Sequence, residues 1–159
     1  MSLVYLALGS NLGEREANLR AARERLATQV RILKTSAVYE TEPWGFREQP
    51  AFLNQVLKGR TALAPLELLD FLKSIEAALG REANFRYGPR VIDLDILFYG
   101  RKVLDTQRLQ IPHPRLHERA FVLVPLAEIA PGLIHPVLRK RVSTLLRDAA
   151  AKDEVHFWA

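Results

Sequence analysis

The clearest secondary-structure pattern in the sequence lies in Pro65-Leu-Glu-Leu-Leu-Asp-Phe-Leu-Lys-Ser-Ile-Glu-Ala-Ala-Leu-Gly80. Apolar residues recur at helical spacing along one face, at Leu68, Leu69, Leu72, Ile75 and Leu79. Pro65 suits the first turn of a helix, and Gly80 suits the left-handed conformation that often follows the last turn. The stretch therefore predicts an amphipathic helix that packs on the rest of the fold.

Strand and helix patterns alternate on either side of this helix. The sequence predicts a strand over residues 3–8, a helix over 14–28, and strands over 32–41, 52–59 and 91–99. Loops rich in proline, glycine or arginine separate these elements at residues 42–50 and 81–90. The order β-α-β-β-α-β is typical of an α+β protein with a ferredoxin-like sandwich, in which two split βαβ units share one sheet.

A C-terminal extension of strands and helices follows this core. It contains a turn at Pro112-His-Pro114 and predicted helices over residues 117–129 and 142–151. The sequence has no repeat, low-complexity stretch or linker. We therefore expect residues 1–159 to form a single domain.

The composition excludes several classes of function. The 159 residues are 48% apolar and 26% charged, which is the balance of a folded globular protein. With no cysteine, the chain has no thiol catalysis, cysteine-bound zinc, iron–sulfur cluster or disulfide. The apolar run at residues 3–8 is too short for a signal peptide or a membrane span, so we expect a cytoplasmic protein. The net charge of +5 suits an anionic partner such as nucleic acid or a polyphosphate, although many arginines alternate with glutamates as on a solvated helix.

Two aspartates in the strand predicted over residues 91–99 carry the strongest chemical signal. Asp93 and Asp95 lie on the same face of a strand, with Cα atoms about 6–7 Å apart. Their carboxylates would repel each other by about 2–3 kcal/mol at an effective dielectric constant near 20. A divalent cation such as Mg²⁺, which uses carboxylates together with substrate phosphates, would compensate for this repulsion. The alternative is a polar sheet face on which the aspartates contact water or arginine.

The loop before these aspartates is basic, because Arg86 and Arg90 flank its Gly-Pro turn and Arg81 lies just upstream. Guanidinium groups beside a cation site suit a polyphosphate, although a loop can also carry arginines for solubility alone. The sequence lacks the Gly-x-x-x-x-Gly-Lys-[Ser/Thr] and Gly-x-Gly-x-x-Gly motifs. Gly9-Ser-Asn-Leu-Gly13 is interpreted as a strand-to-helix turn with Ser10 or Asn11 near the N-cap.

The segment Arg86-x-Gly-Pro-Arg-x-x-Asp-Leu-Asp-Ile-Leu97 resembles the signature of the 6-hydroxymethyl-7,8-dihydropterin pyrophosphokinases. The resemblance covers nearly the whole chain. Further motifs are Leu8-Gly-Ser-Asn-Leu-Gly13, Tyr39-Glu-Thr-Glu-Pro-Trp-Gly45, Gln49-Pro-Ala-Phe-Leu-Asn54, Ile111-Pro-His-Pro114 and Arg119-Ala-Phe-Val-Leu-Val-Pro-Leu126. This family implies transfer of the β,γ-pyrophosphate of ATP to a pterin alcohol in folate biosynthesis, with release of AMP. It implies ATP and 6-hydroxymethyl-7,8-dihydropterin as partners, two Mg²⁺ ions, and a monomer that binds neither nucleic acid nor membrane.

The resemblance also implies roles for individual residues. The catalytic group comprises Arg81, Arg90, Asp93 and Asp95, and the two aspartates are the expected magnesium ligands. The ATP-binding group comprises Glu76, Leu109, Gln110, His113 and Arg119. The pterin-binding group comprises Thr41, Glu42, Pro43, Trp44, Phe52, Asn54 and Phe121. An asparagine amide suits the pyrimidinone edge of a pterin and aromatic rings suit its faces, although both phenylalanines could equally pack in the core.

Three positions depart from the common family pattern. Tyr87 replaces a tryptophan, Ala83 replaces a second loop arginine, and Pro114 replaces an aromatic residue. We therefore expect weaker phosphate contact from the loop that contains Arg81.

Two other functions share some of these features. A metal-dependent phosphohydrolase would use the same aspartates with water as the nucleophile, and an RNA-binding ferredoxin-like module would suit the basic composition but lacks the required aromatic strand motif.

Overall fold

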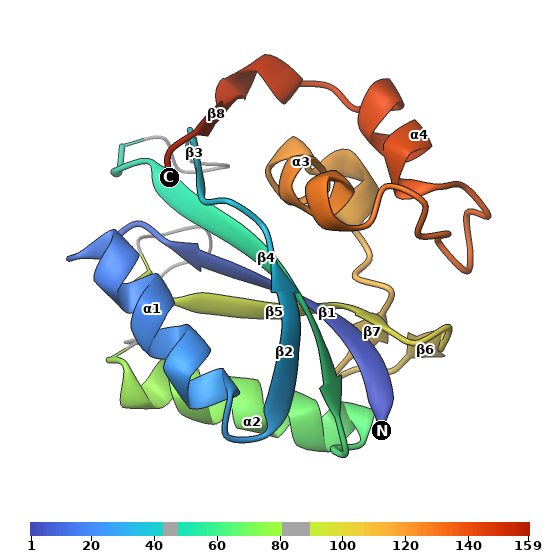
Figure 1. Ribbon diagram of the computed structural model, residues 1–159, viewed down its shortest axis with the longest axis horizontal. Helices are drawn as coiled ribbons and strands as arrows, with labels where there is room; N and C mark the ends of the chain where they lie inside the picture. Colours follow the sequence, from blue (N-terminus) through green and yellow to red (C-terminus); the bar gives the residue numbers. More distant parts are fainter. Residues whose placement is uncertain (43–47, 81–89) are drawn as a thin grey trace.

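The structure is a computed structural model that describes residues 1–42, 48–80 and 90–159. Within these ranges the chain forms a six-stranded antiparallel sheet with helices, which confirms the predicted α+β class (Figure 1). The sheet order is β5-β1-β4-β3-β8, and β2 pairs with β4 next to β3. The strands are β1 (Ser2–Ser10), β2 (Val30–Thr35), β3 (Tyr39–Thr41), β4 (Phe52–Thr61), β5 (Asp93–Tyr99) and β8 (Val155–Phe157). A separate ribbon contains β6 (Leu104–Asp105) and β7 (Gln110–Ile111).

Helices cover the two faces of the sheet in separate layers (Figure 1). On one face lie α1 (Arg15–Leu26) and α2 (Pro65–Ala78), whose apolar stripes join Leu6, Leu8 and Leu94 in one buried cluster. On the other face lie α3 (Ala120–Ile129) and α4 (Val142–Asp148), which pack with Leu97 and Phe98 in a second cluster. The helix predicted from the stretch ending at Gly80 is confirmed, and this glycine has a φ of +92°.

The two ends of β5 are covered differently. Leu94 and Ile96 are buried on the side of α1 and α2, whereas Asp93 and Asp95 are only half-buried on the opposite face. Farther along the strand, Leu97 and Phe98 are buried against the layer of α3 and α4. The first part of the strand therefore alternates as the sequence predicts, and its aspartate face is the part of the sheet that helices leave open.

The strand predicted over residues 32–41 is interrupted, so that β2 and β3 are separate strands on β4. Side chains replace the regular ladder at the break. Ser36 Oγ accepts a hydrogen bond from Val56 N–H at 3.0 Å, and Ala37 N–H donates to the carboxylate of Glu128 at 3.1 Å. These bonds satisfy the backbone without continuous strand pairing, and composition alone does not reveal such bonds.

The C-terminal part differs in detail from the expected helices. The predicted helix over residues 117–129 is a 3₁₀ turn (Leu116–Glu118) followed by α3, because Arg119 between them is extended. The predicted helix over residues 142–151 ends at Asp148, since Ala149 is extended and Ala151 has a φ of +62°. A second 3₁₀ turn (Lys152–Glu154) leads into β8, which adds to the sheet beside β3.

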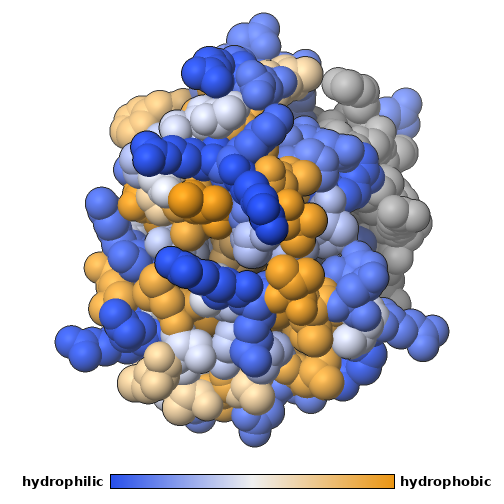
Figure 2. Space-filling view, turned by 90° about the vertical axis from the view of Figure 1, so that its right-hand side faces the viewer, coloured by the Kyte–Doolittle hydropathy of each residue, from blue (hydrophilic) through white to orange (hydrophobic). Residues whose placement is uncertain are grey.

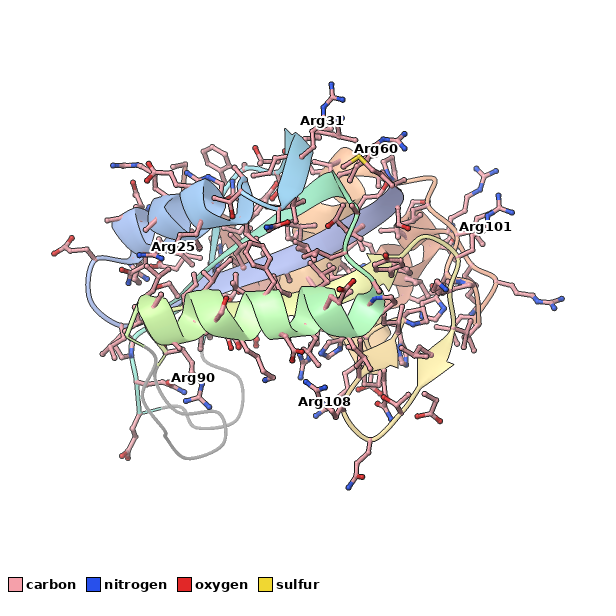
Figure 3. The ribbon with its side chains drawn as sticks, turned by 90° about the horizontal axis from the view of Figure 1, so that it is seen from below. Arg25, Arg31, Arg60, Arg90, Arg101 and Arg108 are labelled. Carbon is pink, nitrogen blue, oxygen red and sulfur yellow. The ribbon has the colours of Figure 1, made fainter. Side chains whose placement is uncertain are left out.

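Arginine side chains project from several sides of the described part of the molecule (Figure 3). Arg31 on β2 and Arg60 on β4 are register partners and lie next to each other, whereas Arg101 follows β5. Hydrophobic residues alternate with hydrophilic ones on the face shown in Figure 2. Among the helices of the described ranges, none has the length and apolar composition needed to cross a bilayer.

The first prediction concerns Gly59, which lies between Val4 and Ile32 in neighbouring strands. A Cβ at this position would lie 2.5 Å from Val30 Cγ1 and 3.0 Å from Arg31 O. We expect Gly59→Ala to lower the free energy of unfolding by about 1–3 kcal/mol through this overpacking, as measured by urea denaturation. Gly132→Ala is the matched control, because no atom of the described residues lies within 4 Å of a Cβ added at this position. Equal stabilities of the two variants would contradict the packing explanation.

Candidate active site

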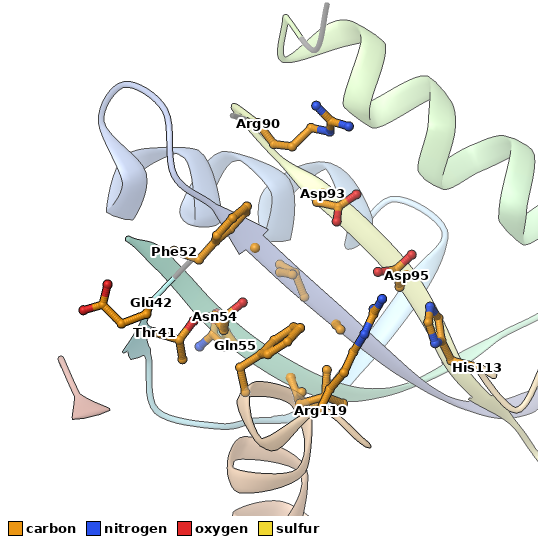
Figure 4. Close-up of a pocket in the computed structure, with 16 residues that line it drawn as sticks. Thr41, Glu42, Phe52, Asn54, Gln55, Arg90, Asp93, Asp95, His113 and Arg119 are labelled. Atoms are coloured by element: carbon orange, nitrogen blue, oxygen red, sulfur yellow. Dashed lines mark hydrogen bonds between the residues drawn. The ribbon is translucent and has the colours of Figure 1, made fainter. Parts of the chain in front are cut away.

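A cavity of about 280 Å³ opens over the uncovered part of the sheet, next to the first turn of α3 (Figure 4). Four strands and α3 contribute to its walls, so residues far apart in sequence meet there. The lining residues are Ala7, Leu8, Gly9, Thr41, Glu42, Phe52, Asn54, Gln55, Val56, Arg90, Asp93, Asp95, His113, Arg119, Phe121 and Val122. The cavity unites members of the catalytic, ATP-binding and pterin-binding groups that the sequence predicts.

The two aspartates form the acidic part of the cavity. Asp93 and Asp95 lie on one face of β5, opposite Gly9 and Ala7 of β1 in the antiparallel register. These small neighbours leave space above the sheet on the side of the carboxylates. Among the described residues no group of three or more histidine, cysteine or carboxylate side chains could hold a metal ion. Two carboxylates nevertheless suit Mg²⁺ that completes its coordination with water and substrate oxygens.

Basic side chains border the carboxylates. Arg90 precedes β5, and Arg119 is the N-cap residue of α3. Figure 4 shows the guanidinium of Arg119 extending toward Asp95 and His113. The guanidinium carbon of Arg119 also lies 5.7 Å from the centre of the Phe121 ring. The cavity therefore places cations and carboxylates next to each other, as a site for a metal-bound polyphosphate requires.

His113 is held in a defined orientation beside these groups. Its backbone N–H donates to Leu97 O at 3.1 Å, and its Nδ1 accepts a hydrogen bond from Arg115 N–H at 3.3 Å. Because Nδ1 is the acceptor, the neutral ring carries its proton on Nε2 and can donate there. Burial, followed by the positive charges of Arg119 and Arg115, lowers the pKa of His113 to about 4. At neutral pH the ring is therefore an uncharged hydrogen-bond donor.

The opposite end of the cavity is more apolar and presents an amide. Asn54 is buried, and its Nδ2 donates to Thr41 Oγ1 at 2.8 Å. Phe52 and Phe121 contribute aromatic rings to the lining. A Cβ on Gly9 would lie 3.3 Å from Asn54 Oδ1 and 3.6 Å from Phe52 Cδ1. The absence of a side chain at Gly9 therefore leaves space at the base of the cavity. Such a combination suits a flat polar heterocycle.

Asn11 ties together the segments that lead into the cavity. Its Nδ2 donates to Gln49 Oε1 at 2.8 Å and to Pro50 O at 3.0 Å. Its Oδ1 accepts from Arg90 N–H at 2.7 Å, and its own N–H donates to Arg90 O at 3.0 Å. The expected helix-capping role is wrong, because Glu14 is the N-cap residue of α1 and caps it without a side-chain hydrogen bond. In the sequence, Asn11 belongs to a glycine-containing turn that follows a buried strand. Such a turn gives no indication of hydrogen-bond partners this distant in the chain.

Several predicted site residues lie elsewhere. Glu76 is buried on the α2 side of the sheet, where its Oε2 accepts from Leu94 N–H at 2.8 Å. Leu109 packs in the core, and Gln110 Nε2 donates to Asp105 Oδ1 at 3.0 Å in the β6–β7 ribbon. None of these three lines the cavity, so their roles at ATP stay predictions. Arg81, Pro43 and Trp44 lie outside the described residues, as do the departures at Ala83 and Tyr87.

Sequence comparison adds independent information about this site. A family model described as 7,8-dihydro-6-hydroxymethylpterin-pyrophosphokinase (HPPK) matches residues 5–131. Two relatives carry the name 2-amino-4-hydroxy-6-hydroxymethyldihydropteridine pyrophosphokinase. The Aquifex aeolicus relative is 49% identical over 140 residues, covering 88% of both chains. The Bacillus subtilis relative is 48% identical over 130 residues, covering 80% of this chain and 78% of the relative.

Structural comparison shows a shared fold. The Plasmodium falciparum HPPK-DHPS wild type with pteroate superimposes with a TM-score of 0.73 at 18% sequence identity. The superposition covers 92% of this chain and 42% of that chain, so this protein spans less than half the length of the solved structure.

The second prediction concerns Asn11, which is 1% exposed. Asn11→Ala removes both side-chain donors and leaves the Arg90 N–H without its Oδ1 acceptor. We expect the free energy of unfolding to fall by about 1–3 kcal/mol in urea denaturation. Thr28→Ala is the control, since Thr28 is exposed and the hydrogen bond from its Oγ1 to Arg25 O is also exposed. A loss no larger than that of the control would contradict a structural role for the buried junction.

The third prediction concerns the His113 ring. Its folded-state pKa of about 4 lies below the ordinary value of 6.5, so the unfolded chain binds the proton more readily between these pH values. This histidine therefore makes stability fall as the pH drops from about 6.5 toward 4, and it has no such effect above that range. An NMR titration, assigned with His113→Gln, should give a midpoint near 4, and Arg119→Gln should raise it. A midpoint at or above 6 in the folded protein would be incompatible with the half-buried, cation-flanked ring.

Proposed function

The chain belongs to the 7,8-dihydro-6-hydroxymethylpterin-pyrophosphokinase family, and we propose on this premise that it transfers pyrophosphate from ATP to 6-hydroxymethyl-7,8-dihydropterin in folate biosynthesis. In this reaction the hydroxymethyl oxygen forms a bond to the β-phosphorus of ATP. The bond between that phosphorus and the oxygen bridging to the α-phosphate breaks, and AMP leaves with the bridging oxygen. The observation that carries the proposal is one cavity with carboxylates and cations at one end and an amide with aromatic rings at the other.

The basic side chains of the cavity would bind the triphosphate. Arg90 and Arg119 offer guanidinium groups that suit phosphate oxygens, and His113 offers the Nε2–H of a neutral ring. Arg81 is proposed as a further phosphate-binding residue from the family pattern alone. Because these donors come from different elements, they can contact the nucleotide from several directions and align the phosphorus with the pterin oxygen.

We propose that Asp93 and Asp95 are the magnesium ligands and that two Mg²⁺ ions take part. The support is chemical, since both carboxylates line the cavity on the same strand face and no third acidic or imidazole group joins them among the described residues. When bound, magnesium reduces the negative charge of the triphosphate and promotes attack at phosphorus. The chain contributes the position of the two carboxylates, which the pairing of β5 with β1 determines.

The pterin would occupy the amide and aromatic end. Asn54 uses one amide N–H on Thr41, so its second N–H and its Oδ1 can serve the donor–acceptor edge of the pyrimidinone ring. Phe52 and Phe121 would contact the faces of the ring. Glu42 lines the same end, and Pro43 and Trp44 are assigned to it from the family pattern only.

We propose that no side chain of the described cavity acts as a strong general base. His113, with a pKa lowered to about 4, has little basicity, and its Nδ1 already accepts a hydrogen bond. The hydroxymethyl proton would then pass to solvent. Catalysis would depend on alignment of the two substrates and on charge neutralisation by the cavity, which suits phosphoryl chemistry.

Further parts of the proposal concern architecture and setting. The sheet order is consistent with a ferredoxin-like βαββαβ core whose second strand is divided into β2 and β3. We also propose that residues 1–159 act as one domain, as a monomer and in the cytoplasm, without a nucleic-acid partner.

The fourth prediction tests the reaction by its products. The protein with ATP, Mg²⁺ and 6-hydroxymethyl-7,8-dihydropterin should yield AMP and pterin diphosphate in equal amounts, and EDTA should abolish the reaction. Asp95→Asn should lower kcat/KM by about 10²–10³-fold, because a half-buried charge that acts on the transition state is lost. Asp148→Asn should change it less than about twofold, since Asp148 is an exposed residue of α4.

Each alternative function gives a different result. ADP and phosphate formed without the pterin would identify a hydrolase. No turnover, together with RNA binding, would favour the RNA-binding module. Equal activities of Asp95→Asn and Asp148→Asn would contradict the metal-binding assignment even if AMP were formed.

A further inference from the structure

The C-terminal residues 155–159 lie beyond the range that the family model matches, yet they pair with β3, whose Thr41 lines the proposed pterin end of the cavity. β8 pairs with β3 in the register Tyr39↔Phe157, Glu40↔His156 and Thr41↔Val155. The pairing continues to the end of the chain, because Trp158 N–H donates to Val38 O at 2.9 Å and Val38 N–H donates to Ala159 O at 2.9 Å. β3 is thereby an interior strand of the sheet.

Trp158 connects this added strand to α1. Its indole N–H donates to the carboxylate of Glu16, and the Arg15 guanidinium carbon lies 5.0 Å from the centre of the indole ring. A cation over an indole face is the most favourable form of the cation–π interaction. The ring therefore helps to hold Arg15 in one conformation, although Trp158 itself is 43% exposed.

Arg15 in turn connects β3 to the residue that precedes β4, and both strands line the cavity. Its Nη1 donates to Glu40 Oε2 and to Ala51 O, both at 2.8 Å. Glu40 immediately precedes Thr41, and Ala51 immediately precedes Phe52. Thr41 and Phe52 are register partners and both line the cavity. Arg15 is therefore hydrogen-bonded to the residue that precedes each member of this pair.

From these contacts we infer that Arg15 and Trp158 are positioning residues for the pterin end of the cavity. Without the added strand, β3 would be a three-residue edge strand, which is too short to define a wall by its own pairing. A displacement of Thr41 would also move Asn54, because Thr41 Oγ1 accepts the hydrogen bond from Asn54 Nδ2. Displacements of about 1 Å in such supporting residues are enough to weaken binding. The inference rests on the proposed function, since it assigns the affected end to the pterin.

The contacts of Trp158 predict a selective effect. The aspartates lie on β5, at the opposite edge of the sheet from β8, and Trp158 contacts α1 and the chain around β3. Val155 differs, because it borders a second cavity of about 70 Å³ together with Arg119 and Phe121. Deletion of the whole segment would thus disturb both ends of the site. A single substitution at Trp158 should affect the proposed pterin end without disturbing the carboxylate end.

The fifth prediction is that Trp158→Ala raises the KM and the Kd for the pterin about tenfold, with kcat and the KM for ATP changed less than about twofold. The Kd is measured by calorimetry with 6-hydroxymethyl-7,8-dihydropterin in the presence of Mg²⁺ and α,β-methylene-ATP, in which the reacting bridge cannot break. Trp158→Phe keeps a ring for Arg15 without the indole N–H and should lose less, about threefold. His156→Ala is the matched control, since it retains the backbone pairing with Glu40 and its own side chain is exposed.

Combination with Arg15→Gln tests the connection between the two residues. If Trp158 acts through Arg15, the double variant should lose little more pterin affinity than Arg15→Gln alone. An unchanged pterin Kd in an active Trp158→Ala protein overturns the inference and leaves the proposed function intact. Equal losses of pterin and nucleotide affinity also overturn it, because they indicate general destabilisation. A wild type that turns ATP over without the pterin overturns the proposed function, and the inference with it.

Discussion

The antiparallel pairing of β1 with both β4 and β5 is the constraint on which the site depends. Gly9 of β1 lies opposite Asn54 on one side and Asp93 on the other, so one row across the sheet joins the amide to the first carboxylate. Because side chains alternate along a strand, a slip of one residue in either pairing would turn one of these groups to the opposite face. Gly9 also has no side chain to fill the space between them. Register and a missing side chain together create the cavity.

Electrostatics explains why the cavity contains both signs of charge. Two carboxylates on one strand repel each other, and cations at Arg90 and Arg119 reduce the cost of holding them near a partly buried surface. Burial, followed by the positive charges of Arg119 and Arg115, lowers the pKa of His113, which keeps the ring neutral. A substrate that brings phosphates and magnesium together matches this mixture. Its anions would face the arginines and its cations would face the aspartates, so neither set has to be desolvated alone.

Local periodicity was sufficient for the parts of the site that one strand or helix defines. The face shared by Asp93 and Asp95 follows from a period of two, and α2 follows from its apolar stripe. The interruption between β2 and β3 was not predictable, because Ser36 and Glu128 replace the ladder from positions distant in the sequence. Asn11 was missed for the same reason. Its partners lie 38 or more residues away, and a single sequence carries no signal for such pairs.

The two ends of the cavity differ in how the chain supports them, and this difference has a physical origin. The carboxylate end lies on β5, a strand of seven residues whose alternate side chains are anchored in the core beneath α2. The end proposed for the pterin lies partly on β3, a strand of three residues that has few buried side chains of its own. A short strand forms few cross-strand pairs, which stabilise its register only weakly. Contacts with neighbouring elements must therefore fix its position. β8 supplies backbone hydrogen bonds to the side of β3 that faces away from β4. Arg15 connects Glu40 of β3 to Ala51, which precedes β4. Recognition of the proposed pterin at this end would therefore depend on contacts formed far from the substrate itself.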